Sequence, residues 1–211
     1  MNRSLIRYLL PSFCVFISGC TSAYESLKSI PVDIPCAAKI TPSRIATSWY
    51  HASIDVMGKH FSGLVLIKNM PDSSRRIVFS SEAGVTFFDF GFDQKGEFKV
   101  YFVQKKLNRK PVLTTLRKDF ELITGIPFIS NNLQSWSTEK EIFFGVQQKK
   151  EKAYFITDKD CSSLHRLELG SKRKRKVSVG IAGMGYPLPD TLDIKHYTFP
   201  LHIQLIRFQK E

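Results

Sequence analysis

The feature that most constrains the fold is a series of short segments in which apolar and polar residues alternate. In the first of them, residues 48–57, the apolar side chains fall at every second position: Tyr50, Ala52, Ile54 and Val56. Gly58, Pro71 and Gly96 lie in the turns that interrupt successive segments. Alternation with a period of two is typical of β-strands, and turn signals at intervals of about 8–12 residues are typical of an antiparallel meander. We therefore predict a mainly β (α+β) fold with about ten strands or more.

One stretch in the middle of the chain has a helical period instead. Its apolar residues fall on one stripe of a helix: Val112, Leu113, Leu116, Phe120 and Ile123. Pro111 suits the first helical position, and Gly125 and Pro127 end the pattern. The spacing predicts one amphipathic helix of about 13 residues, whose stripe must pack on an apolar surface.

Several strand segments are apolar on both faces, among them residues 64–67 and 142–144. Such a sheet must be covered on both faces or must curl around something. A strongly curved sheet with the helix in its mouth satisfies this requirement, and its interior is either a hollow for one apolar ligand or a solid aromatic core. The residues that we expect to line a hollow are Phe61, Val65, Phe88, Phe90, Phe102, Leu116 and Phe120.

The first twenty residues form a separate unit. Arg3 and Arg7 are followed by an apolar run of about ten residues, which is too short to span a bilayer and has the length of a signal-peptide core. Residues 17–20, Ile-Ser-Gly-Cys, resemble the lipobox of bacterial lipoproteins, in which the cysteine receives the lipid. An ordinary cleavable signal with a chance cysteine is the alternative. We predict cleavage before Cys20 and acylation of that cysteine.

An export signal places the mature protein outside the cytoplasm. Thr21 follows Cys20 where an Asp would resemble the signal for inner-membrane retention, so we expect the periplasmic face of the outer membrane. The predicted organisation is a signal peptide over residues 1–19, a lipid-anchored tether over residues 20–40 and one half-barrel domain over residues 41–211. We expect a monomer.

Two cysteines remain outside the signal and the anchor, Cys36 and Cys161. In an oxidising compartment they either form a disulfide or stay as two buried thiols. The sequence leaves both alternatives open.

The chain is basic, with a formal charge of +12. For an exported protein this favours anionic headgroups or cell-wall polymers over nucleic acid as partners. The densest basic run lies at a predicted hairpin tip: Lys172, Arg173, Lys174, Arg175 and Lys176. It is either a membrane contact or a solvated turn that discourages edge aggregation.

The strand pattern resembles the LolA/LolB lipoprotein-carrier superfamily. The stretches that carry the resemblance are residues 56–68, 76–79 and 84–90, with residues 187–197 and 201–208 near the end. The resemblance implies an unclosed β-barrel with one or two helices in its mouth and a cavity that accepts acyl chains. The receptor members also carry a protruding apolar loop, and the matching turn here, residues 69–74, offers only Met70 as a membrane contact and no Leu or aromatic residue.

Motifs for chemistry are scarce. The five histidines form no metal-binding spacing, and scattered surface positions are the expected default for them. No nucleophile elbow is present, and the glycines at 180, 183 and 185 have the wrong order for a dinucleotide loop. We expect no enzyme, no metal and no cofactor.

These observations predict an outer-membrane lipoprotein with a hydrophobic cavity that binds or transfers lipid or acylated proteins. Its partners are then membrane lipid, through the anchor, and an apolar ligand or a lipoprotein. The alternative is a structural or assembly lipoprotein of the envelope that acts through its surface without a ligand. An envelope hydrolase is a third possibility, and it requires an acid–base pair in a cleft.

Overall fold

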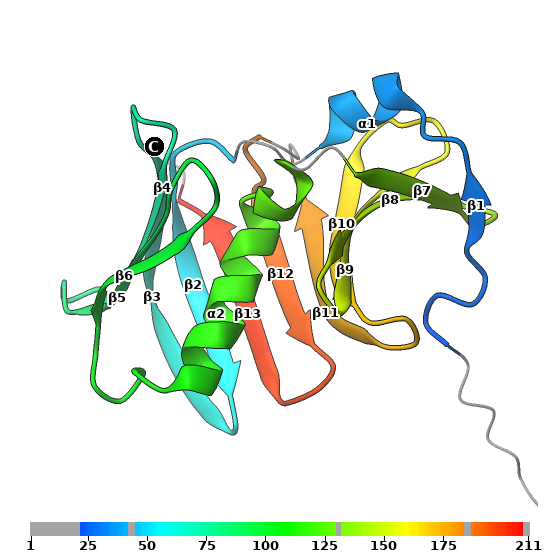
Figure 1. The fold of residues 1–211 in the computed structure, drawn as a ribbon. Helices are drawn as coiled ribbons and strands as arrows, with labels where there is room; N and C mark the ends of the chain where they lie inside the picture. Colours follow the sequence, from blue (N-terminus) through cyan, green and yellow to red (C-terminus); the bar gives the residue numbers. More distant parts are fainter. Residues whose placement is uncertain (1–21, 42–44, 130–131, 184–186, 209–211) are drawn as a thin grey trace, which may run out of the picture.

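The computed structural model describes residues 22–41, 45–129, 132–183 and 187–208. These residues form one antiparallel sheet of 13 strands with two α-helices and one short 3-10 helix (Figure 1). The elements up to the long helix are β1 (Lys28–Ile30), α1 (Ile34–Ile40), β2 (Ser48–Val56), β3 (Lys59–Asn69), β4 (Arg75–Ser80), β5 (Thr86–Phe92), β6 (Phe98–Val103) and α2 (Lys110–Ile123). The later elements are η1 (Ile126–Ile129), β7 (Leu133–Ser137), β8 (Glu141–Gln148), β9 (Glu151–Asp158), β10 (Leu164–Gly170), β11 (Arg175–Ala182), β12 (Thr191–His196) and β13 (Leu201–Arg207).

Two meanders make up the sheet. Strands β2 to β6 pair in chain order, and so do β7 to β13. Pairing of β13 with β2 joins the two meanders, and β1 adds to the edge at β7. Helix α2 connects the meanders across one face, which we call the inner face (Figure 1). Because β1 and β6 are the two edges, the described sheet is an unclosed barrel, and the predicted fold class is confirmed.

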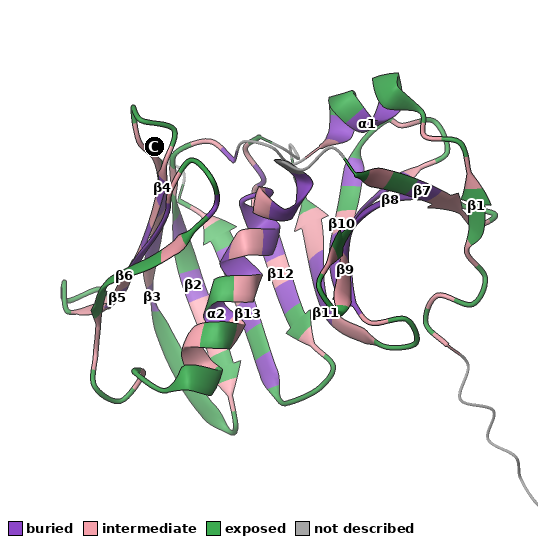
Figure 2. Ribbon diagram, in the orientation of Figure 1, coloured by how far each residue is buried: buried purple, intermediate pink, exposed green. Residues whose placement is uncertain are grey.

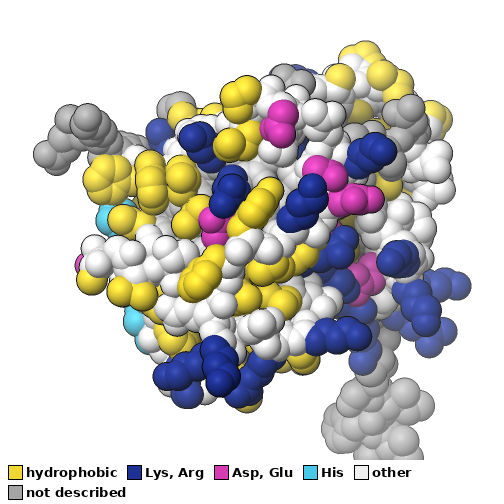
Figure 3. Space-filling view, turned by 60° about the vertical axis from the view of Figure 1, so that its left-hand side comes forward, with side chains coloured by type: hydrophobic (Ala, Val, Ile, Leu, Met, Phe, Trp, Pro, Cys, Tyr) yellow, Lys and Arg dark blue, Asp and Glu magenta, His cyan; other side chains and the backbone are white. Residues whose placement is uncertain are grey.

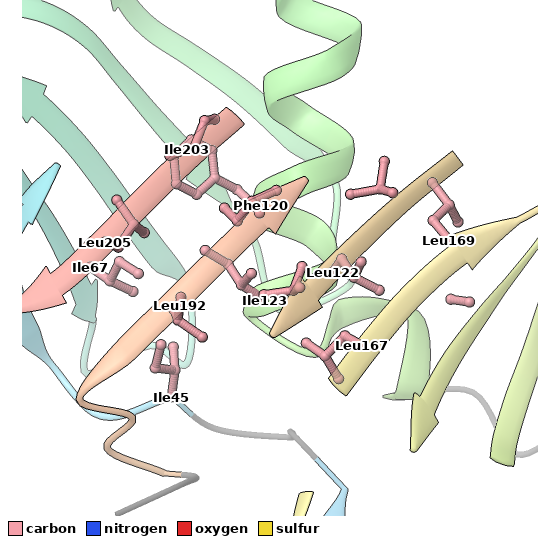
Figure 4. Close-up of a cluster of buried hydrophobic side chains, with 14 of the residues drawn as sticks. Ile45, Ile67, Phe120, Leu122, Ile123, Leu167, Leu169, Leu192, Ile203 and Leu205 are labelled. Atoms are coloured by element: carbon pink, nitrogen blue, oxygen red, sulfur yellow. The ribbon is translucent and has the colours of Figure 1, made fainter. Parts of the chain in front are cut away.

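The register gathers the apolar residues on the inner face. Ile203 of β13 lies between Ile194 of β12 and Ile54 of β2, and Ile54 is paired in turn with Phe61 of β3. Because directly paired residues of an antiparallel sheet point to the same side, each such row continues across several strands. Figure 4 shows Phe120 and Ile123 of α2 directed from the helix toward β12 and β13.

Helix α2 agrees with the prediction and begins one residue earlier, at Lys110. Pro111 lies in its first turn, where the missing N–H costs nothing. Leu116, Phe120 and Ile123 are buried, as expected for the apolar stripe. The helix therefore covers the inner face with the residues that the helical period singles out.

The second apolar face of β8 to β10 is covered by the beginning of the described chain. Phe143, Tyr154 and Ile156 form a small cluster there with Tyr24 and Leu27. Residues 22–40 were expected to be a tether, and this is corrected by the structure: they dock on the sheet, add β1 to β7 and form α1. The physical reason is the apolar surface that these strands leave on their outer side.

Cys36 of α1 is joined to Cys161 in the β9–β10 turn by a disulfide, with a Cα–Cα distance of 5.7 Å. The bridge closes a long section of chain and fixes α1 to one end of the sheet. Of the two alternatives that the sequence leaves open, the structure contains the disulfide.

The two ends of the sheet carry different turns. One end holds the β2–β3, β4–β5, β8–β9, β10–β11 and β12–β13 turns and the β6–α2 loop; we call it the basal end (Figure 1). The opposite end holds the β3–β4, β5–β6, β7–β8 and β9–β10 turns. In the described part of the chain, no helix has the length and apolar character needed to cross a bilayer.

Candidate functional site

Five of the seven predicted lining residues converge beneath α2. They come from β3, β5 and α2, and each is at most 8% exposed: Val65, Phe88, Phe90, Leu116 and Phe120. The rings of Phe88 and Phe90 stack with centroids 4.3 Å apart, and Phe120 meets Phe88 edge-on at 5.7 Å. Neither the hollow beside the β2–β3 and β12–β13 turns nor the hollow beside the β10–β11 turn is lined by any of these five residues. The contacts around Phe88 therefore fill the space between this part of α2 and the sheet with side chains.

Phe102 does not belong to this cluster. A β-bulge between Asp89 and Phe90 shifts the register, so that Phe102 pairs with Asp89 while Val100 pairs with Phe90. The bulge breaks the period of two on β6, and Phe102 points to the outer side, 47% exposed. The prediction for Phe102 is wrong for this reason. Figure 3 shows hydrophobic side chains between Lys and Arg side chains on this side of the molecule.

Phe61 faces inward but lies beyond the buried core, near the basal end, where it is 36% exposed. Its row partner Ile54 and the neighbouring Val56 are half-buried, as are Val112 and Leu113 in the first turns of α2. We call these five residues the mouth. Figure 2 shows the same gradient: the basal half of α2 and of β2–β3 is exposed or intermediate, and the other half of the helix is largely buried.

A buried polar pair lies among these apolar groups. The Asp119 carboxylate of α2 is fully buried, and its Oδ2 lies 3.0 Å from Nε2 of His196 on β12. Burial raises the pKa of Asp119, although His196 opposes the shift. Oδ1 of Asp119 has no hydrogen-bond partner within the described residues. The helix is thus joined to the sheet at a point where a charge is costly.

A second polar contact lies next to the first. Glu151 of β9 accepts hydrogen bonds from Lys118 of α2 and Lys176 of β11, each at 2.6 Å. Burial would raise the pKa of Glu151, but the two ammonium groups outweigh it and the pKa is lowered. We call Lys118, Asp119, Glu151, Lys176 and His196 the latch, because they connect the second half of α2 to the sheet.

Sequence reasoning missed the Asp119–His196 pair and treated the histidine as a surface residue. The pattern held a signal for both groups. His196 follows Leu192 and Ile194 at every second position, which places it on their inner face. Asp119 lies three residues after Leu116 and therefore on the apolar stripe of the helix.

The predicted membrane contacts are divided between the two ends of the sheet. Met70 lies in the β3–β4 turn, at the end opposite to the β10–β11 turn that carries the basic run. In that run Lys172, Arg173 and Lys174 are exposed, whereas Arg175 pairs with Glu168 and Lys176 belongs to the latch. One flat membrane surface cannot touch Met70 and the basic turn together.

The other histidines lie at the surface. His60 is 2.8 Å from Asp55, and His202 pairs with Asp193. In the described residues no group of His, Cys, Asp and Glu side chains has a metal-binding arrangement. Cys20, the predicted acylation site, lies outside the described residues.

No protein-family model and no curated protein matches the sequence. Among solved structures, the chain is similar to a crystal structure of a DUF1329 family protein from Desulfovibrio piger, at 8% identity and a TM-score of 0.45. The similarity covers 82% of this chain and 88% of that protein. It is a distant likeness.

Proposed function

We propose that this protein is a lipid-anchored component of the outer membrane, acylated at Cys20, whose half-barrel accepts an acyl chain at the mouth. The observation that carries the proposal is the apolar lining of the inner face, which continues from the buried core to half-exposed residues at the basal end, among them Ile54 and Phe61. A lining of this kind suits the hydrocarbon chain of a lipid or of an acylated protein.

The filled core determines how such a ligand enters. We expect the ligand to displace the first turns of α2, because side chains already fill the space beneath the second half of the helix. The start of α2 is weakly held, because Arg109 at the N-cap makes no side-chain hydrogen bond to the helix and the first turn contains no acidic residue. The latch holds only the second half. The basal half of the helix is thus the part that gives way.

Transfer then follows from differential burial. Each methylene group moved from water into the mouth contributes about 0.8 kcal/mol. Release therefore requires a membrane or a partner that buries the chain equally well. The proposal assigns no catalytic step and no cofactor.

The test uses the mature chain with Cys20→Ser, purified without detergent, and a fluorescent fatty-acid probe. Phe61→Ser is expected to weaken probe binding by about tenfold, because the substitution removes apolar area from the mouth. Phe102→Ser is the matched control, an exposed phenylalanine on the outer side of the sheet, and it is expected to leave the affinity unchanged. Absence of probe binding, or an equal loss in both variants, contradicts the proposal.

A second function is favoured by the filled interior itself. The protein then acts as an assembly lipoprotein through its surface, and the exposed edge strand β6, with Val100, Tyr101 and Phe102, is its contact. This alternative predicts no acyl binding and a loss of partner association in Phe102→Ser but not in Phe61→Ser. The same pair of variants therefore separates the two functions.

A further inference from the structure

The basal end is strongly basic. Its turns and loop carry Lys105 and Lys106, Lys149 and Lys150, and residues 172–174, all of them exposed. Within the described ranges none of these side chains forms an ion pair. Figure 3 shows Lys and Arg side chains gathered along the lower part of the molecule, where Figure 1 places the basal end.

The opposite end has a different balance of charge. Its turns carry Asp72, Asp93, Glu97, Glu139 and Asp160. Lys95, Lys140 and Lys159 are the basic residues in the same turns. Glu82 in the β4–β5 turn is the one acidic residue among the basal turns and loop, so these segments are strongly positive, whereas the turns named at the opposite end are net negative. Such an asymmetry orients a protein at a charged surface.

Apolar side chains are exposed between the basic turns. Met57 in the β2–β3 turn is 78% exposed, and Tyr197 and Phe199 in the β12–β13 turn are 47% and 36% exposed. The Met57 N–H donates to the Pro200 carbonyl at 3.1 Å, which places the two turns side by side. Basic residues interleaved with Tyr, Phe and Met suit the headgroup layer of a bilayer.

The beginning of the described chain lies on the same end. Ala23 N–H donates to the Arg173 carbonyl at 3.1 Å, and Tyr24 Oη donates to the buried Glu168 at 3.1 Å. A Cβ at Gly170 would collide with the Tyr24 ring, so the glycine makes room for this docking. A hollow of about 690 Å³ beside the turn is lined by Ala23, Arg173, Lys174, Arg175, Tyr197 and Thr198.

Chain length then links this end to the anchor. Cys20 precedes Ser22 by two residues, a span of at most about 7 Å. The acylation site of the proposed function is therefore joined by a very short stretch of chain to a segment that is docked on the β10–β11 turn.

We propose that the basal end docks on the anionic headgroup surface of the membrane that holds the anchor, with Arg173 and Lys174 facing lipid phosphates. The inference rests on the acylation of Cys20 in the proposed function and adds an orientation to it. The mouth opens at the basal end, so docking turns Phe61 toward the bilayer and gives an acyl chain a short path between them.

The test measures flotation of the Cys20→Ser chain with phosphatidylcholine vesicles, with and without phosphatidylglycerol. We expect binding only to the anionic vesicles, weakened by salt. Lys172→Glu/Arg173→Glu/Lys174→Glu is expected to lower the bound-to-free ratio at least about tenfold. The control, Lys95→Glu/Lys140→Glu/Lys159→Glu, changes the net charge equally at the opposite end and is expected to have an effect of less than about twofold.

Binding that ignores phosphatidylglycerol, or an equal loss in both triple variants, overturns the docking surface. Fatty-acid probe binding is measured on the same proteins. If the triple variant at residues 172–174 keeps both its probe affinity and its binding to anionic vesicles, the proposed orientation is wrong and the proposed function stands. If the Cys20→Ser chain without further substitutions fails to bind the probe, the proposed function itself is refuted.

Discussion

At the scale of single residues, the least expected feature is a carboxylic acid on the apolar stripe of α2. Asp119 is enclosed with His196 between helix and sheet, and the surrounding groups are largely hydrocarbon. Burial favours the protonated acid, whereas His196 and the nearby Lys118 favour the carboxylate, and burial is the larger effect.

A pH-dependent prediction follows for Asp119→Asn. The pKa of Asp119 in the folded protein lies above its unfolded value of about 3.9, so the folded state binds more protons and stability falls as the pH rises between the two values. The amide of the variant cannot ionise, so the stability of the variant does not fall in this way as the pH rises. Urea unfolding of both proteins at several pH values should give nearly equal stability in acid and a growing advantage of the variant toward neutral pH. A wild-type advantage that grows with pH would instead indicate a stabilising ion pair.

The packing of the interior is tested by Phe88→Ala. Phe88 is 2% exposed and contacts Phe79, Phe90 and Phe120, so its removal should cost about 3–5 kcal/mol of unfolding free energy. Phe102→Ala, at an exposed position, should cost less than about 1 kcal/mol. Denaturant titration of both variants measures the difference. Similar small losses at the two positions would mean that the interior is loosely packed.

At the scale of elements, pattern reasoning succeeded where an element is long. The hairpin from β2 to β3 and helix α2 follow from their periods, because many residues repeat the same signal. The short elements were missed, because β1 has three residues, β7 has five and α1 has seven, too few to repeat a periodic signal. The bulge in β6, where Tyr101 is the extra residue, was also missed, because Phe98, Val100 and Phe102 continue the alternation of the sequence straight through it.

The contact that holds α2 against the second meander is tested by Glu151→Gln. The lowered pKa of Glu151 means that its ion pairs with Lys118 and Lys176 stabilise the fold above its ordinary pKa of about 4.3 and lose this contribution as the pH falls. The variant should therefore be less stable by about 1–3 kcal/mol near neutral pH and similar to the parent in acid. Parallel stability curves over the whole pH range would show that these pairs contribute nothing.

At the scale of the whole molecule, the open sheet was predictable and the distribution of charge was not. The basic pairs of the basal end lie far apart in the sequence, from Lys105 to Lys174, and each one alone is an ordinary polar turn. They come to lie at the same end of the sheet because antiparallel strands return to that end at every second turn. The position of the mouth has the same origin, since it combines β2 and β3 with the start of a helix that crosses between two meanders.

The docking of residues 22–27 on the sheet is tested by Tyr24→Ala. The tilted ring of Tyr24 packs against Tyr154 with ring centroids 5.0 Å apart, and its hydroxyl donates to Glu168. Without Tyr24, Arg166 and Arg175 still neutralise that carboxylate. Its loss should release residues 22–27 while the half-barrel stays folded, so limited proteolysis should cut this segment several times faster in the variant. An exposed aromatic in the opposite half, Tyr101→Ala, is the control and should leave the rate unchanged. If both variants are cut alike, the segment is a free tether, and a lipid on Cys20 would no longer bring the basic turn to the membrane.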